Sequence, residues 1–296
     1  MKVLITGASG LVGRAVQNHC VAEGDEVNAF DHKSLDIADD ESARSVIARA
    51  RPDVVINCAA WTDVDGCESD PERAQRVNAH GPEALASACS EVGALFITIS
   101  TDYVFDGRKD GFYTQQDQPN PISVYGQSKL NGEIRAQQAF GRTIVVRSGY
   151  IFGSGGKNFL STFLERAKAG DSLKAISDMV GTPTYARDLA RRLRRLALLD
   201  LPGTYHVVNA GHGVSFQGFA LAAMEMAGLD ARLVHGTTLA ELNRPAPRPR
   251  NSRLRCLLSE ELGLDPLPDW QRALRDFIET ESANSLKALV SGPGPH

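Results

Sequence analysis

Tyr125 and Lys129 stand four residues apart in a segment, 123–133, with helical spacing. Residues at this separation leave the same face of a helix and can meet the same small molecule. A phenol has a reference pKa of about 10, and a neighbouring cation stabilises its phenolate. Such a pair can exchange a proton with a carbonyl or alcohol oxygen while a cofactor carries hydride to the carbon. Tyr and Lys also occur at this spacing by chance. The elements around them must therefore show whether the pair is functional.

Composition favours a small-molecule partner. The chain has 296 residues, 42% of them hydrophobic, and its 32 basic and 36 acidic residues give a net charge of −4. This balance argues against nucleic acid or an anionic membrane as a partner. The five cysteines form no metal-ligand spacing and suit reduced thiols. No apolar run reaches transmembrane length, and Met1 leads directly into a strand. We therefore expect a cytoplasmic protein without a metal.

A glycine-rich turn follows the first expected strand. The run 3–6 is apolar and β-branched, and Gly7, Gly10 and Gly13 follow at three-residue intervals before a helix to about Glu23. Glycines permit close backbone approach, and the helix N-terminus offers free N–H groups to a pyrophosphate. The pattern predicts a dinucleotide site.

The second expected strand, 26–30, ends at Asp31. A carboxylate at this place meets the adenosine ribose hydroxyls and favours NADH. The neighbouring His32 and Lys33 could instead attract a 2′-phosphate, so NADPH and NADH both stay open. An ordinary turn or cap is the alternative role for Asp31.

Further strands at 53–57 and 95–100 alternate with helices near 40–51 and 71–92. This order predicts an α/β fold, a doubly wound parallel sheet of the Rossmann type, whose ligands lie at the carboxyl ends of the strands. The small residues Cys58, Ala59 and Ala60 would let a cofactor lie close to the backbone. Thr101 at the fourth strand end could hydrogen-bond a substrate carbonyl, or it could simply cap that end.

The second half loses strict alternation. A strand at 143–147 and another near 205–208 accompany helices at 158–169, 185–199, 216–227 and 270–281. We expect a cofactor domain at 1–150, to which some later segments return, a smaller substrate-binding lobe at 151–281, and a disordered tail at 282–296. Arg248, in a run of arginines and prolines, could contact a diphosphate or remain solvated.

Several short runs, in this order, resemble the extended short-chain dehydrogenase/reductases and, within them, the dTDP-4-dehydrorhamnose reductase family. The similarity extends to about Glu281. The runs are 3–10 (VLITGASG), 57–65 (NCAAWTDVD), 77–79 (VNA), 100–107 (STDYVFDG), 124–130 (VYGQSKL), 156–159 (GKNF), 181–184 (GTPT) and 248–254 (RPRNSRL).

The resemblance implies catalysis by Thr101, Tyr125 and Lys129, with NADPH or NADH on the glycine turn and a dTDP-deoxysugar as substrate. A homodimer is one expected assembly. Together with Tyr125 and Lys129, the cofactor residues implied are Gly7, Gly10, Leu11, Val12, Gly13, Asp31, Asp36, Ile37, Cys58, Ala59 and Ala60. The substrate residues implied are Thr62, Asp102, Tyr103, Val104, Tyr150, Asn158 and Arg248.

Two departures keep alternatives open. The family usually has Arg-Thr-Ser-Trp where this chain has Arg-Ser-Gly-Tyr at 147–150, so the preferred sugar or base could differ. Leu11 stands where many members have a glutamine. The same local pattern of the glycine turn occurs in a relative that serves as a regulatory subunit of methionine adenosyltransferase. The alternatives are therefore a nucleotide-binding regulatory subunit, and a reductase or epimerase for another nucleotide sugar.

Overall fold

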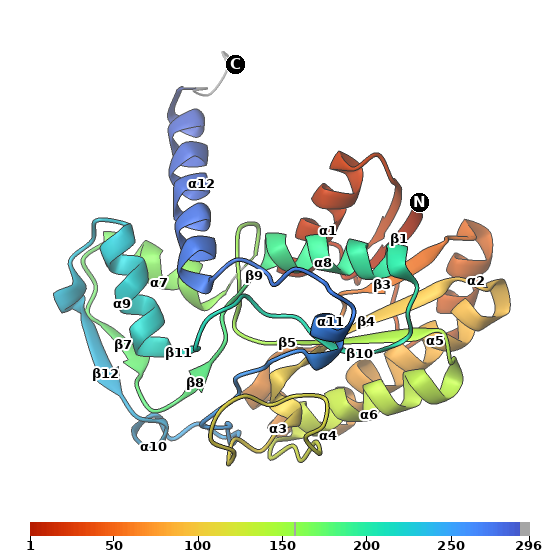
Figure 1. The fold of residues 1–296 in the computed structure, drawn as a ribbon, viewed down its shortest axis with the longest axis horizontal. Helices are drawn as coiled ribbons and strands as arrows, with labels where there is room; N and C mark the ends of the chain where they lie inside the picture. The colour runs from red at the N-terminus through yellow and green to blue at the C-terminus, as the bar shows by residue number, and fades with distance from the viewer. Residues whose placement is uncertain (157, 291–296) are drawn as a thin grey trace.

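A six-stranded, wholly parallel sheet organises the protein (Figure 1). The computed structural model describes residues 1–156 and 158–290. The strand order is β10-β5-β4-β3-β1-β2. This confirms the predicted doubly wound sheet, including the return of a late strand to it. The strands are β1 (Lys2–Thr6), β2 (Glu26–Phe30), β3 (Val54–Asn57), β4 (Leu95–Thr101), β5 (Thr143–Ser148) and β10 (Gly203–His206).

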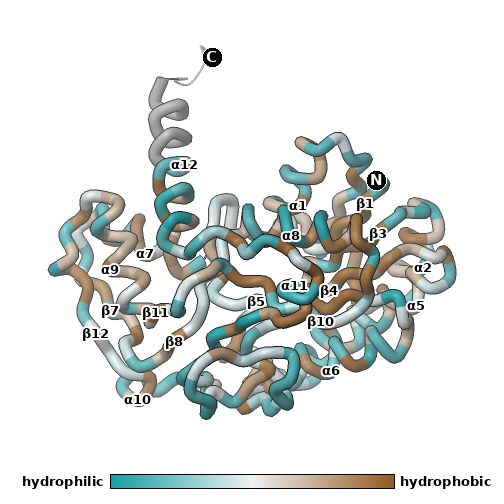
Figure 2. The backbone as a smooth tube through the Cα atoms, in the orientation of Figure 1, coloured by the Kyte–Doolittle hydropathy of each residue, from teal (hydrophilic) through white to brown (hydrophobic). Residues whose placement is uncertain are grey.

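Helices cover both faces of this sheet. On one face α1 (Leu11–Ala22) packs beside α8 (Ala186–Leu199), and on the other lie α2 (Asp40–Ala50), α5 (Gly81–Val92) and α6 (Val124–Ala139). Successive strand residues point to opposite faces, so Val3 and Ile5 join the first core and Leu4 joins the second. The central strands are accordingly mainly apolar, as the brown tube near β4 shows in Figure 2.

The helix predicted at 71–92 is divided in the structure. After α3 (Val64–Ser69) come α4 (Pro71–Gln75), a wider π-helical turn η1 (Arg76–His80), and then α5. The turn holds Asn78, whose side chain accepts from the N–H of Trp61 at 2.8 Å and donates to the Ser128 hydroxyl at 3.1 Å. These bonds tie the segment after β3 to α6, and single π turns of this kind are frequent at functional sites.

Three two-stranded sheets and several helices form the other side of the molecule (Figure 1). Aromatic side chains, among them Phe152, Phe219 and Phe277, fill one of its cores. The strand pairs are β6 (Ile151–Phe152) with β9 (Thr184–Tyr185), β7 (Leu173–Ile176) with β12 (Val234–Thr237), and β8 (Val180–Gly181) with β11 (Val214–Ser215). The helices on this side are α7 (Phe159–Lys168), α9 (Phe216–Met226), η3 (Ala231–Leu233), α10 (Leu239–Leu242) and α12 (Trp270–Val290), whereas α11 (Leu257–Glu261) lies against β10 of the large sheet.

Helix α12 corrects the prediction for the end of the chain. It continues to Val290, so residues 282–290 are helical where a disordered tail was expected. The rest of that expected tail, 291–296, lies outside the described residues. No helix in the described ranges is long and apolar enough to span a membrane.

The sheet opens a crevice at its carboxyl edge. Strand β1 pairs with β2 on one side and with β3 on the other, so the connections after these strands leave in opposite directions. A reversal of this kind is where doubly wound sheets bind ligands. The segments that follow β1, β3, β4 and β5 all meet there.

Candidate active site

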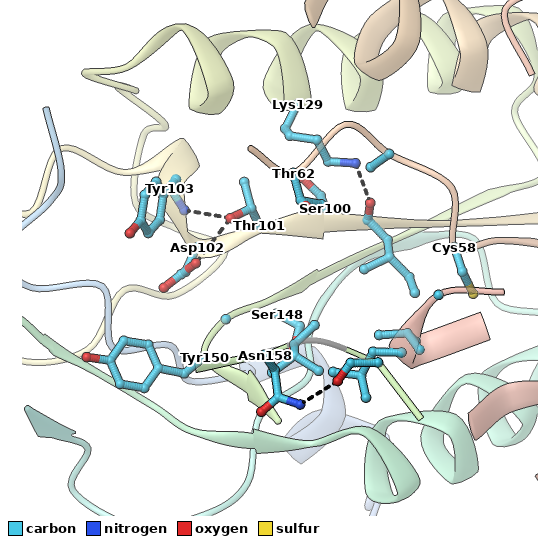
Figure 3. A pocket seen from close by; sticks show the side chains of 18 of the residues that line it. Cys58, Thr62, Ser100, Thr101, Asp102, Tyr103, Lys129, Ser148, Tyr150 and Asn158 are labelled. Carbon is cyan, nitrogen blue, oxygen red and sulfur yellow. Dashed lines mark hydrogen bonds between the residues drawn. The ribbon is translucent and has the colours of Figure 1, made fainter. Parts of the chain in front are cut away.

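A cavity of about 580 Å³ lies at this carboxyl edge. Figure 3 shows Lys129, Thr101 and Thr62 on one side of it, and Ser148 and Asn158 on the other. The short helix η2 (Asp102–Val104) begins at its wall. The predicted residues that line the cavity are Gly10, Leu11, Val12, Cys58, Ala59, Ala60, Thr62, Thr101, Asp102, Tyr103, Tyr125, Lys129, Tyr150 and Asn158.

The glycine turn fits a dinucleotide. Gly7 has a φ of +66°, which favours glycine, and a Cβ there would lie 2.6 Å from the Ala59 nitrogen. A Cβ at Gly13 would lie 2.2 Å from the Gly7 carbonyl oxygen. Both glycines therefore let β1, α1 and the segment after β3 approach closely, although neither lines the cavity itself. Gly10, Leu11 and Val12, at the start of α1, line the cavity, and a helix N-terminus offers free N–H groups to a pyrophosphate.

The residues expected at the adenosine end lie outside the cavity. The Asp31 carboxylate caps its own turn, accepting from the N–H groups of Lys33 and Ser34 at 3.1 and 3.0 Å. Its bonds to Ser34, chiefly the one from the hydroxyl, lower the pKa of Asp31. Asp36 accepts from the N–H of Ala38 at 3.1 Å, and Ile37 is buried. The turn-cap geometry weighed for Asp31 is thus present, and its carboxylate stays exposed.

Helix α6 carries Tyr125 and Lys129 into the cavity. Ser123 caps the helix by accepting from the N–H of Gly126 at 3.1 Å, and the two side chains lie on one face as predicted. The Lys129 amino group donates to the carbonyl of Ile99 at 2.7 Å. Burial lowers the pKa of Lys129 to about 8, against the opposing effects of Glu133 and Cys58.

The pKa of Tyr125 differs from the expectation. Burial raises it well above the ordinary value, and the Thr101 hydroxyl, facing the phenol, acts in the opposite direction. Lys129 was expected to lower this pKa, but its amino group is directed to the Ile99 carbonyl. Tyr125 therefore holds its proton firmly, which suits a group that donates a proton to a stronger base.

Thr101 and Asp102 form the wall facing Tyr125. The Thr101 hydroxyl oxygen accepts from the N–H of Tyr103 at 3.2 Å and lies 3.1 Å from Asp102 Oδ1. Asp102 is buried, and burial raises its pKa to about 6. A Cβ on Gly149 would lie 2.4 Å from the Asp102 carboxyl, so the glycine that departs from the family pattern makes room for this group.

A buried ion pair behind Lys129 was missed from the sequence. Glu133 lies one helical turn beyond Lys129 and binds Arg147 on β5 through two nitrogens, at 2.6 to 3.1 Å. The Ser100 hydroxyl also donates to Glu133. The signal was available, because 125, 129 and 133 repeat at four-residue intervals on one helix face.

The predicted substrate residues divide into two groups. Tyr103, Tyr150 and Asn158 line the cavity with Thr62 and Asp102, whereas Val104 packs in the protein core. Arg248 lies outside the cavity and is held by Asp65, with its two terminal nitrogens each 3.0 Å from a carboxylate oxygen.

Tyr150 adopts a φ of +50°, and its ring lies 3.8 Å from that of Phe216. This anchors the aromatic group expected near the substrate. Other residues that line the cavity were not singled out by sequence reasoning, namely Ser9, Val64, Ile99, Ser100, Ser148, Gly149, Ile151, Gly156 and Phe159.

The sequence and fold of this chain are similar to those of known proteins. The family model described as RmlD substrate binding domain matches residues 1–283. The chain belongs to this family. The resemblance to dTDP-4-dehydrorhamnose reductases is also confirmed, since the protein of that name from Streptomyces griseus is 39% identical over 99% of this chain and 96% of its own length.

Two solved structures share the fold of this RmlD-family chain closely. The dTDP-4-dehydrorhamnose reductase of Clostridium acetobutylicum is 38% identical, with a TM-score of 0.91 over 95% of this chain and 100% of that one. The reductase of Bacillus anthracis, solved in complex with NADP, is 33% identical, with the same TM-score and coverage.

Proposed function

We propose that this chain reduces the 4-keto group of dTDP-4-dehydro-L-rhamnose, or of a close dTDP-deoxysugar, with NADPH or NADH, giving dTDP-L-rhamnose. One observation carries the proposal. Thr101, Tyr125 and Lys129, from two separate elements, converge on the cavity that the glycine turn enters. The names of the similar proteins and the NADP complex of the Bacillus anthracis reductase support it.

The cofactor would lie between the glycine turn and α6. Backbone N–H groups near Gly10, Leu11 and Val12 would bind the pyrophosphate, and Lys129 would hold the nicotinamide ribose. When bound, the nicotinamide supplies a hydride to the carbonyl carbon of the sugar. Asp31 favours NADH by its place after β2, but its exposed carboxylate and the neighbouring Lys33 leave room for NADPH.

Tyr125 would supply the proton in this reaction. As the carbonyl carbon gains hydride, its oxygen becomes an alkoxide, which takes the phenolic proton of Tyr125 and becomes the product hydroxyl. The phenolate left behind recovers a proton from solvent, and the ammonium group of Lys129, bonded to the Ile99 carbonyl, would contribute positive charge to the same cavity. Thr101 would donate a hydrogen bond to the carbonyl oxygen as negative charge develops there.

The remaining site residues have proposed roles on the substrate side. Thr62, Asp102, Tyr103, Tyr150 and Asn158 would contact the nucleotide sugar. The segments at 151–281 would form a substrate-binding lobe beside the cofactor domain at 1–150. A homodimer and a cytoplasmic location remain predictions, which sedimentation and cell fractionation would check.

The test is oxidation of NADPH and NADH, followed in parallel by absorbance, with dTDP-4-dehydro-L-rhamnose generated in situ. The wild type is expected to oxidise at least one of them rapidly. Tyr125→Phe is expected to be slower by about 10²–10⁴-fold, because it lacks the transferable proton, while still binding cofactor.

Undiminished turnover in the Phe variant would contradict the role of Tyr125. No oxidation by a wild type that binds cofactor would favour the regulatory-subunit alternative. Oxidised cofactor retained through purification would point to an epimerase.

A further inference from the structure

Asp102 is an unusual neighbour for a catalytic hydroxyl, because it is a buried carboxyl with an incomplete set of partners. Its side chain is 2% exposed. Oδ1 contacts the Thr101 hydroxyl, whereas Oδ2 has no hydrogen-bond partner among the described residues. The Ser252 hydroxyl faces the carboxyl and acts against the rise in its pKa, but it lies outside hydrogen-bond geometry and has no other partner among the described residues. A buried carboxylate left in this state is strongly disfavoured relative to the neutral acid.

No cation in the described part of the chain pairs with Asp102. The titratable groups that face Asp102 are three phenols, Tyr103 from η2, Tyr125 from α6 and Tyr150 from the turn after β5. No ion pair of Asp102 occurs within the described ranges.

The two cations nearest this wall are engaged elsewhere. Lys129 is bonded to the Ile99 carbonyl, and Arg248 is bonded to Asp65. Burial raises the pKa of Asp102 to about 6, so the neutral form is populated in mildly acidic solution.

The charge of Asp102 decides where the single hydrogen of Thr101 points. A hydroxyl has one donor hydrogen and two acceptor sites, and Thr101 already accepts from the Tyr103 N–H. If Asp102 is ionised, Oδ1 can only accept, and the Thr101 hydroxyl donates its hydrogen to Oδ1. If Asp102 is protonated on Oδ1, it donates to Thr101, which then has both acceptor sites filled and its hydrogen free for the cavity.

We propose that Asp102 is a positioning residue for Thr101, whose protonated form donates to the Thr101 hydroxyl and so turns the Thr101 hydrogen toward the carbonyl oxygen of the substrate. This inference rests on the proposed reductase function. It makes Asp102 a proton-dependent control of the step in which Thr101 stabilises the developing alkoxide. Hydride transfer should therefore slow as Asp102 ionises, with Tyr125 and Lys129 unchanged.

The experiment measures the single-turnover rate of cofactor oxidation from pH 5 to 7, below the range in which Lys129 loses its proton, with a deuterated cofactor to confirm that hydride transfer is being observed. In the wild type we expect the rate to fall about tenfold across this range, because the neutral fraction of a carboxyl whose pKa is about 6 falls by about that factor. Loss of one donor at a developing oxyanion is large enough to produce it. Asp102→Asn cannot ionise, and this fall should shrink to less than about twofold. A fall of unchanged size in Asp102→Asn would overturn the inference.

Two variants of Thr101 test whether the effect acts through its hydroxyl. Thr101→Ser keeps a hydroxyl and should keep the fall in rate, whereas Thr101→Val has nothing to orient and should lose it. In the Val background, Asp102→Asn should leave the shape of the pH profile unaltered. A Val variant that keeps the fall would overturn the inference even if Asp102→Asn does not fold.

A measurement independent of turnover separates this inference from the proposed function. Infrared spectra of the wild type should contain a protonated-carboxyl band at pH 5 that disappears as the pH rises and is missing from Asp102→Asn. Absence of that band at pH 5 would overturn the inference. A wild type that shows the band but oxidises no cofactor would instead overturn the proposed reductase function.

Discussion

Two buried carboxyls flank the cavity, and they have opposite surroundings. Glu133, behind Lys129, is 3% exposed and binds Arg147 through several contacts, with a further bond from Ser100. Asp102, behind Thr101, is 2% exposed, and Oδ1 alone has a partner among the described residues. Equal burial therefore leaves an ion-paired carboxylate behind Lys129 and a carboxyl with a raised pKa behind Thr101. The partners of a buried group, rather than its depth, set its chemistry.

The largest effect on stability should come from breaking the ion pair between Glu133 and Arg147. Glu133→Ala leaves the Arg147 guanidinium buried without a counter-charge, and we expect it to lower the free energy of unfolding by about 3–5 kcal/mol. Urea unfolding followed by circular dichroism measures this. The control is Glu133→Ala combined with Arg147→Met, which removes both charges and should be less destabilised than the single variant. If the free energy of unfolding of Glu133→Ala lay within about 1 kcal/mol of the wild-type value, the claim that Glu133 and Arg147 form a buried ion pair important for stability would be contradicted.

The next effect concerns the pH dependence of stability. The pKa of Asp102 rises from 3.8 to about 6 on folding, so the native state binds this proton more tightly than the unfolded chain does. The resulting stability is fully present below about pH 4 and is lost as the pH rises through about 6, a change of about 3 kcal/mol.

Asp102→Asn should remove this part of the pH dependence. The difference in unfolding free energy between wild type and variant, measured at intervals from pH 4 to 7, should change across that window. If the unfolding free energies of wild type and Asp102→Asn ran parallel with pH, the Asp102 carboxyl would have the same pKa in the folded and unfolded states.

A smaller effect should appear at Lys129. Its pKa is lowered to about 8 by burial, and Glu133 opposes that lowering. Glu133→Gln keeps the shape of the side chain but removes the charge, so Lys129 should lose its proton at lower pH. We expect the reduction rate at pH 8 to fall about two- to tenfold, and the rate at pH 6 to change less.

Full pH profiles of wild type and Glu133→Gln measure this shift. Glu83→Gln, on the outer side of α5 where Glu83 pairs with Arg135, is the matched control and should not move the profile. A shift of the same size in both variants would remove Glu133 from any specific role beside Lys129.

The sequence predicted the sheet better than the second half of the molecule. Runs such as 95–100 are mainly apolar because parallel strands are covered on both faces, and this pattern is local. The pairing of β7 with β12 joins segments about 60 residues apart, and nothing in either short run indicates its partner. The π turn at Arg76–His80 was missed for a similar reason, because Asn78 is held there by Trp61 and Ser128 from other elements.

In the candidate site, too, features set by local sequence were predicted and features set by tertiary contacts were not. The spacing of Tyr125 and Lys129 and of the three glycines predicted the helix and the turn that meet at the cavity, since one helix or one turn fixes those positions. Their catalytic and cofactor-binding roles stay predictions. The same reasoning placed Asp31 and Arg248 in a binding site. Asp31 caps its own turn and Arg248 is bound to Asp65, and their roles in binding stay predictions.

The sequence by itself determined the strand, turn and helix that bind a dinucleotide and the helix face that presents Tyr125 and Lys129. These features depend on neighbours within a few residues, through backbone conformation and helical periodicity. Only the tertiary structure decided that Glu133 is fully partnered and that Asp102 is not. The charge of a buried group depends on what other segments bring near it. For Asp102 the neighbouring Thr101 supplies a hydrogen-bond partner, Gly149 and Ser252 come from other elements, and no cation among the described residues forms an ion pair with it.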